Sequence, residues 1–323
     1  MKRMRMMAAA LAMMISAVAI GQSKVYMTKE ITPEALVKIY QALGREANGR
    51  VAVKISTGED GGNNYLKPTL IRQLVETVNG TIVECNTAYG GSRQDPKKHW
   101  ETIHKHGFDS IFAVDIMDEF GQIRIPVKDQ KYLKYDIVGE HLAHYDFMIN
   151  LAHFKGHAMG GFGGVLKNAS IGVASTAGKC YIHSAGKTDD PKLAWTPEYL
   201  AAGKTQDSFL ESMAAAAQGV HEYFGGGQRI IYINVMNNMS VDCDCDSHPA
   251  DPKMKDIGIL ASLDPVALDK ACLDLVFGHK DKEGDDSKPL QARINRQHGT
   301  YIVDYAEKIG LGSMKYELIN IDK

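Results

Sequence analysis

Two short stretches of the chain carry side chains that can bind a metal ion. The first contains His153 and His157, four residues apart among glycines and lysines. The second contains Cys243 and Cys245, which are separated by one residue. Thiolate and imidazole groups together form common ligand sets of zinc and of other borderline-soft transition metals. We therefore expect these four residues to bind a divalent transition metal such as zinc, iron or nickel, if the fold brings them together.

The histidine stretch is rich in glycine, which predicts a loop rather than a helix. Gly160, Gly161, Gly163 and Gly164 follow His157 closely, and glycine in a helix interior lowers helix stability. The backbone N–H groups of such a loop can approach an anion closely. We expect these four glycines to help bind a cofactor or a substrate. The alternative is a tight turn that carries surface histidines.

Cationic and polar side chains near these stretches predict an anionic ligand. Lys155 and Lys167 flank the glycines, and we expect them to act in catalysis together with His157. Asn86 and Arg93 follow another apolar run, and such side chains can bind a carboxylate or phosphate. The alternative for this second pair is the end of a strand followed by a turn.

The cysteine stretch is also acidic, because Asp242, Asp244 and Asp246 alternate with the two cysteines. In an extended segment, side chains two residues apart point to the same side, so both sulfurs would share one side. Neighbouring carboxylates raise thiol pKa values unless a cation is present, which favours a bound metal. The alternative is an acidic loop with two inert thiols.

Short apolar runs alternate with amphipathic helical segments along the chain, which predicts an α/β fold. Such a pattern is typical of a mostly parallel sheet with helices on both faces, in Rossmann-like layers. Ligands of these sheets bind beyond the carboxyl ends of the strands. This rule directs attention to four loops: 56–64, 86–93, 153–167 and 236–249. The predicted strands are 50–56, 81–85, 110–114, 146–152, 229–236 and 257–261, and the predicted helices include 97–106, 208–224 and 301–309.

The composition is that of an ordinary globular protein. The chain has 323 residues, a formal charge of −2, 44% hydrophobic residues and 24% charged residues. This composition excludes a disordered or low-complexity chain, and the near-neutral charge provides no basic surface for nucleic acid. We therefore expect a small anionic molecule as the partner, and the sequence makes no prediction of the oligomeric state.

The first 21 residues have the pattern of a secretory signal peptide. Lys2, Arg3 and Arg5 precede an apolar run, and small residues stand before Gln22. We expect an exported protein, periplasmic or extracellular, with no stable membrane insertion after cleavage. The alternative is an uncleaved N-terminal anchor. Residues 22–323 are then expected to form one domain with surface insertions near 185–206 and 278–288.

Several of these motifs, in this order, resemble the family called domain of unknown function 362, whose members are often labelled iron–sulfur centre proteins. The resemblance covers nearly all of the mature chain. Longer relatives resemble this chain but carry cysteine runs of the C-x-x-C type, which bind iron–sulfur clusters. No C-x-x-C occurs in this sequence, which argues against a 4Fe–4S cluster here. The matching stretches are 51–58, 84–87, 153–168, 242–245 and 256–265.

A weaker similarity links the stretch from His157 to Lys167 to nickel-pincer lactate racemase. In that enzyme the corresponding lysine carries the tethered cofactor. The similarity implies that His157 and Lys167 face one cleft. Three functions remain open: a metal-dependent enzyme acting on a small anionic substrate, a non-catalytic metal-binding or ligand-binding protein, and the iron–sulfur protein that the longer relatives imply.

Overall fold

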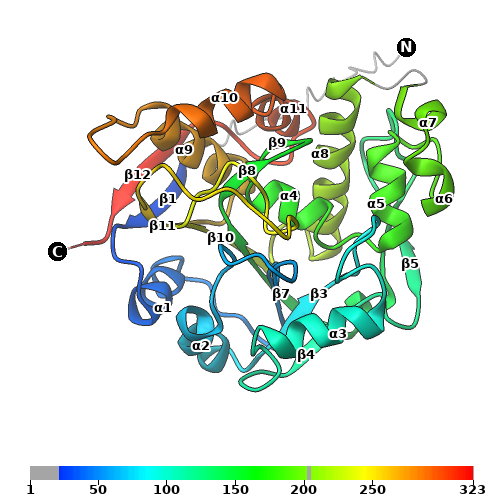
Figure 1. The fold of residues 1–323 in the computed structure, drawn as a ribbon. Coiled ribbons are helices and arrows are strands. Elements are labelled where there is room, and N and C mark those ends of the chain that lie inside the picture. Colours follow the sequence, from blue (N-terminus) through cyan, green and yellow to red (C-terminus); the bar gives the residue numbers. More distant parts are fainter. Residues whose placement is uncertain (1–21, 202–204, 323) are drawn as a thin grey trace, which may run out of the picture.

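The computed structural model describes residues 22–201 and 205–322, so the predicted signal peptide lies outside the described residues. The centre of the molecule is an eight-stranded sheet of order β12-β1-β11-β10-β7-β2-β3-β4 (Figure 1). Its strands are β1 (Ser23–Thr28), β2 (Val51–Lys54), β3 (Gly80–Glu84), β4 (Val114–Ile116), β7 (Phe147–His153), β10 (Ile230–Met236), β11 (Gly258–Ser262) and β12 (Tyr316–Asn320).

The sheet is mostly parallel, as the sequence predicts. Strands β10, β7, β2, β3 and β4 run parallel to one another. Strand β11 is antiparallel to both of its neighbours, β10 and β1. Strands β1 and β12 pair in parallel although they come from opposite ends of the described chain. The predicted α/β fold class is therefore confirmed.

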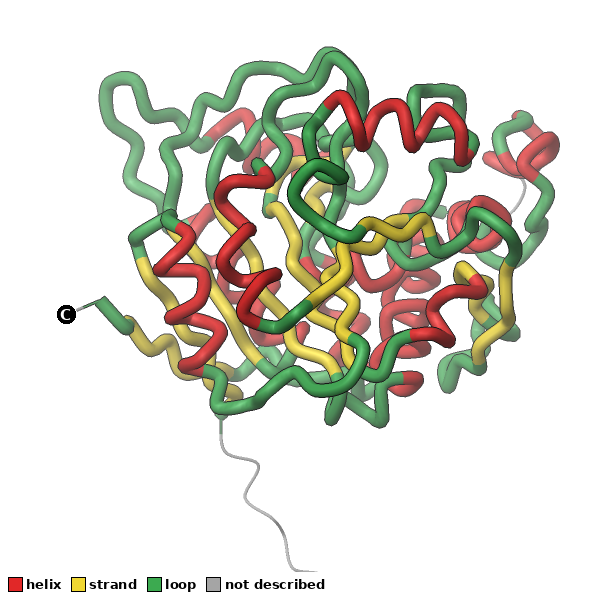
Figure 2. Tube along the Cα trace, turned by 90° about the horizontal axis from the view of Figure 1, so that it is seen from below, coloured by secondary structure: helices red, strands yellow, loops and turns green. Residues whose placement is uncertain are grey.

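Helices cover both faces of the sheet, and Figure 2 shows the strands enclosed between them. Helices α1, α2 and α3 cover one face, and α4, α8, α9 and α11 cover the other (Figure 1). The helices are α1 (Pro33–Ala42), α2 (Pro68–Thr77), α3 (Pro96–Lys105), α4 (Val165–Ser170), α5 (Thr176–His183), α6 (Pro191–Ala194), α7 (Pro197–Ala201), α8 (Gln206–Tyr223), α9 (Pro265–Phe277), α10 (Lys288–Arg296) and α11 (Tyr301–Lys308).

Alternation along the central strands divides the apolar side chains between two cores. In β7, Phe147, Ile149 and Leu151 pack toward α1–α3, whereas Met148 and Ala152 pack toward the opposite helices. Successive side chains of a strand point to opposite faces, so a strand that is covered on both sides must be apolar at nearly every position. This requirement explains the continuous apolar runs of the sequence.

Two predicted elements differ from the structure. The run 110–114 was expected to be a strand, but β4 begins only at Val114, and Phe112 packs into the core from a turn. An apolar run alone does not distinguish a buried strand from a buried turn. Helix α8 begins two residues before the predicted start, and a capping box between Thr205 and Ser208 stabilises its first turn.

The glycine-rich stretch forms a hairpin, where a loop was predicted. Its strands are β8 (Lys155–His157) and β9 (Gly161–Gly163), and helix α4 follows directly. Gly161 has a φ of +81° at the turn, a conformation that glycine adopts without steric cost. A second small hairpin pairs β5 (Gln122–Ile125) with β6 (Asp136–Gly139). The hairpin β8–β9 brings Lys155, His157 and the glycines into one compact unit, and Lys167 lies on the helix that follows.

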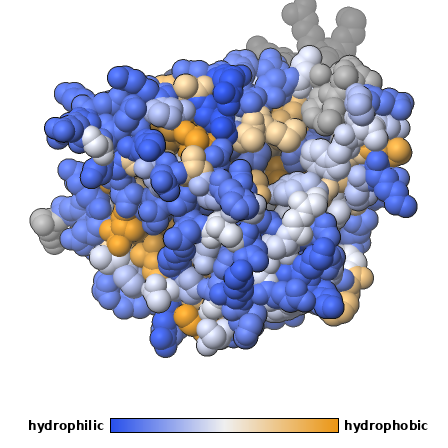
Figure 3. Space-filling view, viewed as in Figure 1, coloured by the Kyte–Doolittle hydropathy of each residue, from blue (hydrophilic) through white to orange (hydrophobic). Residues whose placement is uncertain are grey.

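The stretches predicted as insertions lie outside the main sheet. Residues 185–206 contain the short helices α6 and α7, and residues 278–288 form a loop closed by a bridge between Lys282 and Asp285. None of the described helices is both long and apolar enough to cross a membrane. The face seen in Figure 3 is mostly hydrophilic, and its apolar residues gather in small patches.

A buried carboxylate, Asp136, stands at the start of β6. One of its oxygens accepts a hydrogen bond from the N–H of Ile137 at 2.8 Å. Its other oxygen has no hydrogen-bond partner among the described residues. Burial raises the pKa of Asp136 to about 7, because it disfavours the charged form.

We predict that Asp136→Asn changes how stability depends on pH. The folded-state pKa lies above the unfolded value of about 3.9, so the contribution of Asp136 is present below pH 4 and is lost as pH rises through 7. The free energy of unfolding of the variant, relative to wild type, should therefore increase by about 2–3 kcal/mol from pH 5 to pH 8. Urea unfolding at both pH values measures it. The exposed control Asp304→Asn should show no such increase, and an equal response of both variants would contradict the assignment.

Candidate functional site

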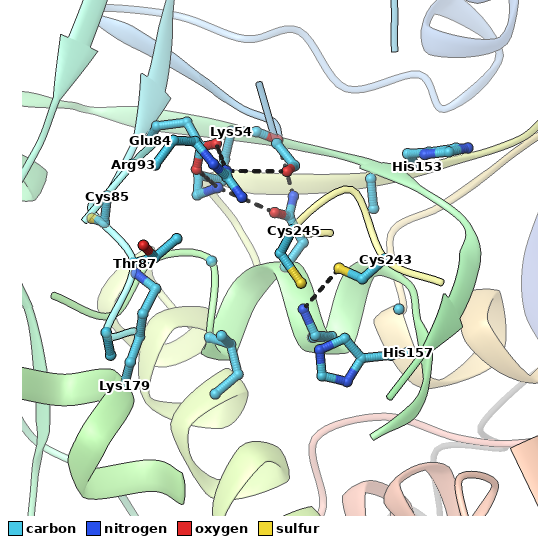
Figure 4. Close-up of a pocket in the computed structure, with 18 of the residues that line it drawn as sticks. Lys54, Glu84, Cys85, Thr87, Arg93, His153, His157, Lys179, Cys243 and Cys245 are labelled. Atoms are coloured by element: carbon cyan, nitrogen blue, oxygen red, sulfur yellow. Dashed lines mark hydrogen bonds and ion pairs between the residues drawn. The ribbon is translucent and has the colours of Figure 1, made fainter. Parts of the chain in front are cut away.

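The carboxyl ends of four neighbouring parallel strands surround an enclosed cavity of about 80 Å³ (Figure 4). Each of the four predicted loops contributes to its wall: Ser56 follows β2, Thr87 follows β3, His153 ends β7 and Cys243 follows β10. Carboxyl ends of parallel strands meet at one edge of a sheet, which is why residues so distant in sequence converge here.

Three of the four predicted metal ligands come together at this cavity. Side-chain donor atoms of His157, Cys243 and Cys245 all lie within 4.8 Å of one another. Both cysteine sulfurs point into the same space (Figure 4). The segment is not extended, as the alternation argument required, but turns here, because the N–H of Asp246 donates to the carbonyl oxygen of Cys243 at 2.9 Å. His157 is the last residue of β8, so the hairpin and the cysteine segment together supply the three possible metal ligands.

His153, the fourth predicted ligand, lies outside this group. Its Nδ1 pairs with an oxygen of Asp244 at 2.8 Å, and its Nε2 lies 2.6 Å from the carbonyl oxygen of Asn237. The other oxygen of Asp244 accepts a hydrogen bond from Lys155 Nζ at 2.6 Å. Asp244 lies in the turn that joins the two cysteines, and its carboxylate points toward His153 and Lys155. His153 and Lys155 thus hold the cysteine segment in place instead of facing the metal group.

These buried partners also set the charge of Asp244. Burial opposes the ionised carboxylate, but His153 and Lys155 outweigh it and hold the pKa of Asp244 well below its usual range. Burial likewise opposes the charge of Lys155, and Asp244 raises its pKa above the ordinary value. Both groups are therefore ionised at neutral pH and form a buried ion pair.

The hairpin approaches the cysteine segment closely because Gly156 has no side chain. The N–H of Gly156 donates to the carbonyl oxygen of Ser240 at 2.8 Å. A Cβ at this position would lie 2.2 Å from the carbonyl oxygen of Val241, which is far inside van der Waals contact. Glycine is therefore required for β8 to place His157 beside the sulfurs.

The backbone of the hairpin fixes the protonation of the His157 ring. Its Nδ1 accepts hydrogen bonds from the N–H groups of Gly160 at 2.8 Å and of Met159 at 3.3 Å. Burial, followed by the charge of Lys167, keeps the pKa of His157 well below its ordinary range. The ring is therefore neutral and carries its proton on Nε2, because Nδ1 acts as an acceptor.

This protonation bears on whether the residues fit a metal. Two thiols and one imidazole are a suitable donor set for a borderline-soft metal, and neutral imidazole is the form that coordinates. Coordination through Nε2 of His157 would move the ring proton to Nδ1. The amides of Met159 and Gly160 would then have to turn away. The donor set fits a metal, with this one local adjustment on binding.

The two thiols differ in acidity. A hydrogen bond from Cys245 lowers the pKa of Cys243 well below the ordinary thiol value, and Lys167 acts in the same direction. The same hydrogen bond, together with burial, raises the pKa of Cys245. Lys167 Nζ lies 3.9 Å from the sulfur of Cys243. The pair therefore shares one proton, with the negative charge on Cys243.

The neighbouring aspartates do not raise both thiol pKa values, in contrast to the expectation from the sequence. Asp244 is neutralised by its buried partners. Asp242 forms an ion pair with Arg293 at 3.1 Å, and Asp246 is exposed to solvent. Asp244 still acts to raise the pKa of Cys243, but the hydrogen bond from Cys245 and the charges of Lys167 and Lys155 outweigh it.

Lys167 is held at the cavity by helix α4. The carboxylate of Asp269 accepts hydrogen bonds from the N–H groups of Val165 and Leu166, each at 3.0 Å, at the first turn of α4. Gly164 permits this approach, because a Cβ there would lie 2.3 Å from an oxygen of Asp269. Burial raises the pKa of Asp269 to about 6. The capped helix directs Lys167 toward Cys243.

A buried ion network forms the opposite wall of the cavity (Figure 4). Glu84 pairs with Lys54 at 3.0 Å and with Arg93 at 2.9 Å, and Arg93 also contacts Glu59 at 3.2 Å. Burial opposes the charge of Glu84, but the two cations lower its pKa well below the usual range. Lys54 Nζ also donates to the side-chain oxygen of Asn168 at 3.3 Å, which joins this wall to α4.

The residues predicted to bind a cofactor have different locations. Gly163 and Gly164 line the cavity, whereas Gly160 contributes its amide to the His157 ring. Arg93 lines the cavity but is engaged by the two glutamates. Asn86 is turned away, since its N–H and its side-chain amide both donate to Asp118, at 2.8 and 2.9 Å.

Two buried lysines of the cavity were not singled out from the sequence. Lys54 ends strand β2, and its only signal is a charged residue at the end of an apolar run. Lys179 lies on α5, a helix that was not predicted, and its Nζ donates to the carbonyl oxygen of Ala174 at 2.5 Å. Within the described part of the chain, neither Lys179 nor Lys167 forms an ion pair with a carboxylate. The cavity therefore holds two lysines without a carboxylate partner among the described residues, of which Lys167 faces the sulfur of Cys243.

Comparisons with known proteins place the chain in a family. A family model described as "Domain of unknown function (DUF362)" matches residues 51–274. This match covers more than half of the chain, so the chain belongs to this family, and the resemblance found in the sequence is confirmed. The chain matches no curated protein.

Two solved structures are similar to the chain at 13% sequence identity. A protein from Thermotoga maritima has a TM-score of 0.43, with 74% of this chain and 56% of that protein covered. The lactate racemase apoprotein from Thermoanaerobacterium thermosaccharolyticum has a TM-score of 0.39, with 93% and 83% covered. The chain thus spans little more than half the length of the Thermotoga protein.

We predict that Asp244→Asn lowers the free energy of unfolding by about 3–5 kcal/mol, because it leaves Lys155 buried without its counter-charge. Urea unfolding of the purified protein measures the loss. The matched control is Asp246→Asn, an exposed aspartate two residues away, which should change stability by less than about 0.5 kcal/mol. Equal effects of the two substitutions would show that the buried pair contributes nothing particular to stability.

Proposed function

We propose that this member of the DUF362 family binds a transition metal at His157, Cys243 and Cys245 and acts on a small anionic molecule beside it. The observation that carries the proposal is the convergence of these three donor groups within 4.8 Å at the wall of a cavity. Two thiols and an imidazole suit zinc, iron or nickel. A metal bound there would supply a Lewis acid or an activated water.

The residues of the chain itself account for binding of an anion. Lys167 and Lys179 bring positive charge to the cavity without a carboxylate partner among the described residues. Lys155 and Lys54 are already neutralised by Asp244 and Glu84. An anion that enters the cavity therefore meets Lys167 and Lys179 as its counter-charges.

A second candidate function is that of a metal carrier without catalysis. Its support is the position of Cys245, which is only partly buried and also lines a wider cavity open to solvent. An ion held by a partly exposed thiol can exchange more readily than an enclosed one. Rapid loss of metal to a chelator, without any dependence on small anions, would favour the carrier over the enzyme.

We also propose that the protein is exported. The support is the tripartite pattern of residues 1–21, in which a basic start, an apolar run and small residues follow one another. The proposal predicts that the full-length chain, expressed in a bacterium, loses about 2 kDa and is recovered in the periplasmic or extracellular fraction. Replacement of Lys2, Arg3 and Arg5 by serine should slow this processing, and recovery of full-length protein in the cytoplasm would contradict export.

We predict that the purified mature chain contains about one equivalent of a transition metal per chain. Elemental analysis should find that Cys243→Ser combined with Cys245→Ser removes it, because the remaining imidazole cannot hold the ion alone. Cys180→Ala is the control, because Cys180 is buried on α5 away from the group. This variant should retain the metal.

Metal content that is equally low in wild type and in the double variant would overturn the metal site. Thermal unfolding of all three proteins shows whether a variant lost metal merely because it failed to fold. His157→Ala should weaken metal binding about 10-fold or more while both sulfurs remain, because one of the three donors is lost.

A further inference from the structure

The cavity with the cysteines adjoins a second, much larger cavity, because the two share lining residues. The inner cavity measures about 80 Å³ and the outer one about 700 Å³. Five residues line both cavities and therefore form the boundary between them: Tyr89, His157, His183, Cys243 and Cys245. The proposed metal site therefore stands at the junction of two spaces that differ in size.

The size and the positive charge of the inner cavity suit an anionic group. A single water needs roughly 10–15 Å³ of such space, so 80 Å³ admits a few waters or one carboxylate-sized group. Lys167 and Lys179 lie at its wall without a carboxylate partner in the described chain. The inner cavity is too small for a ring together with its substituents.

The outer cavity has a different chemistry. No lysine or arginine is among its lining residues, and its rim carries the acidic residues Asp60, Asp242 and Asp246. An additional anionic group is therefore disfavoured there. The wall instead presents the aromatic rings of Tyr89 and Trp195, whose centroids lie 6.4 Å apart in an edge-on arrangement.

This aromatic wall is held in position before any ligand binds. The indole N–H of Trp195 donates to the carbonyl oxygen of Ala88 at 2.6 Å, which fixes the ring against the loop after β3. Tyr89 is 37% exposed, so part of its ring is accessible from the outer cavity. Met159 completes this side of the cavity. A fixed aromatic surface facing an open space is suited to stacking against a planar group.

We propose that the ligand of this protein is bipartite, with a carboxylate head in the inner cavity and an aromatic body against Tyr89 and Trp195 in the outer one. The bond that joins the two parts then passes Cys243, Cys245 and His157. The proposal rests on the anion site of the proposed function and names its substrate class, but it does not depend on a bound metal. The acidic rim adds a preference against a second negative charge on the aromatic body.

The test measures binding of three probes by calorimetry to the protein as purified: acetate, 3-phenylpropanoate and the neutral 3-phenylpropanamide. The phenyl acid should bind about 10-fold more tightly than acetate, since an aromatic contact contributes about 1 kcal/mol beyond its buried area. It should also bind at least about 10-fold more tightly than its amide, because the amide lacks the charge that Lys167 and Lys179 attract.

Variants separate the two halves of the proposal. Trp195→Ala should weaken the phenyl acid about 5- to 10-fold and leave acetate unchanged, whereas Trp195→Phe should preserve most of the affinity. Lys179→Met should weaken both acids and leave the amide unchanged. Trp100→Phe is the control, because Trp100 lies on α3 and is not among the lining residues of either cavity.

The outcomes distinguish failure of this inference from failure of the proposed function. Equal affinity for acetate and the phenyl acid would overturn the bipartite ligand and leave the anion site standing. Equal affinity for the phenyl acid and its amide would overturn the anion site itself. Absence of binding by all three probes would overturn the inference as a whole, and the metal site is judged separately from elemental analysis.

Discussion

One buried carboxylate determines how the two halves of the site meet. Asp244 stands between the cysteines and accepts hydrogen bonds from His153 and Lys155. The segment turns here, with the N–H of Asp246 bonded to the carbonyl oxygen of Cys243, so anchoring Asp244 fixes the turn that presents Cys243 and Cys245 to the cavity. The charged triad is expensive to bury unless every partner is present. The position of the two thiols therefore depends on a contact that involves neither sulfur nor the His157 ring.

The rest of the cavity is held by the same kind of contact between strand ends and a neighbouring helix. Asp269 fixes the first turn of α4 through backbone N–H groups, and Asn168 of the same helix donates to Lys54 and Asn150. These bonds connect α4 to two central strands, β2 and β7. A side chain on α4, Lys167, is consequently placed against Cys243 by contacts in the wall of the cavity and in the core behind it. The site is rigid because its supports are buried and paired.

Charge distinguishes the supports from the groups left for a ligand. Lys54, Lys155 and Arg93 each have a carboxylate partner, and their role is to stabilise the walls. Lys167 and Lys179 have none among the described residues, so their charge is directed at whatever fills the space. The inner cavity thus combines positive charge with soft donor atoms, whereas the outer cavity combines aromatic rings with an acidic rim. In the proposed complex, His157, Cys243 and Cys245 would therefore lie between two chemically different halves of the ligand.

The sequence by itself determined the fold class and the loops of the site, because apolar runs identify parallel strands and parallel strands bring their carboxyl ends together. It also predicted that both cysteine sulfurs share one side, but by alternation in an extended segment, whereas the structure brings them together in a turn between Cys243 and Asp246. It did not determine which histidine would face them, although His153 and His157 are only four residues apart. That choice depends on Asp244, on the missing side chain of Gly156 and on the hairpin turn. Likewise, only the tertiary structure decided which lysines of the cavity lack a carboxylate partner among the described residues. The carboxylates that pair with Lys54 and Lys155 come from distant parts of the chain.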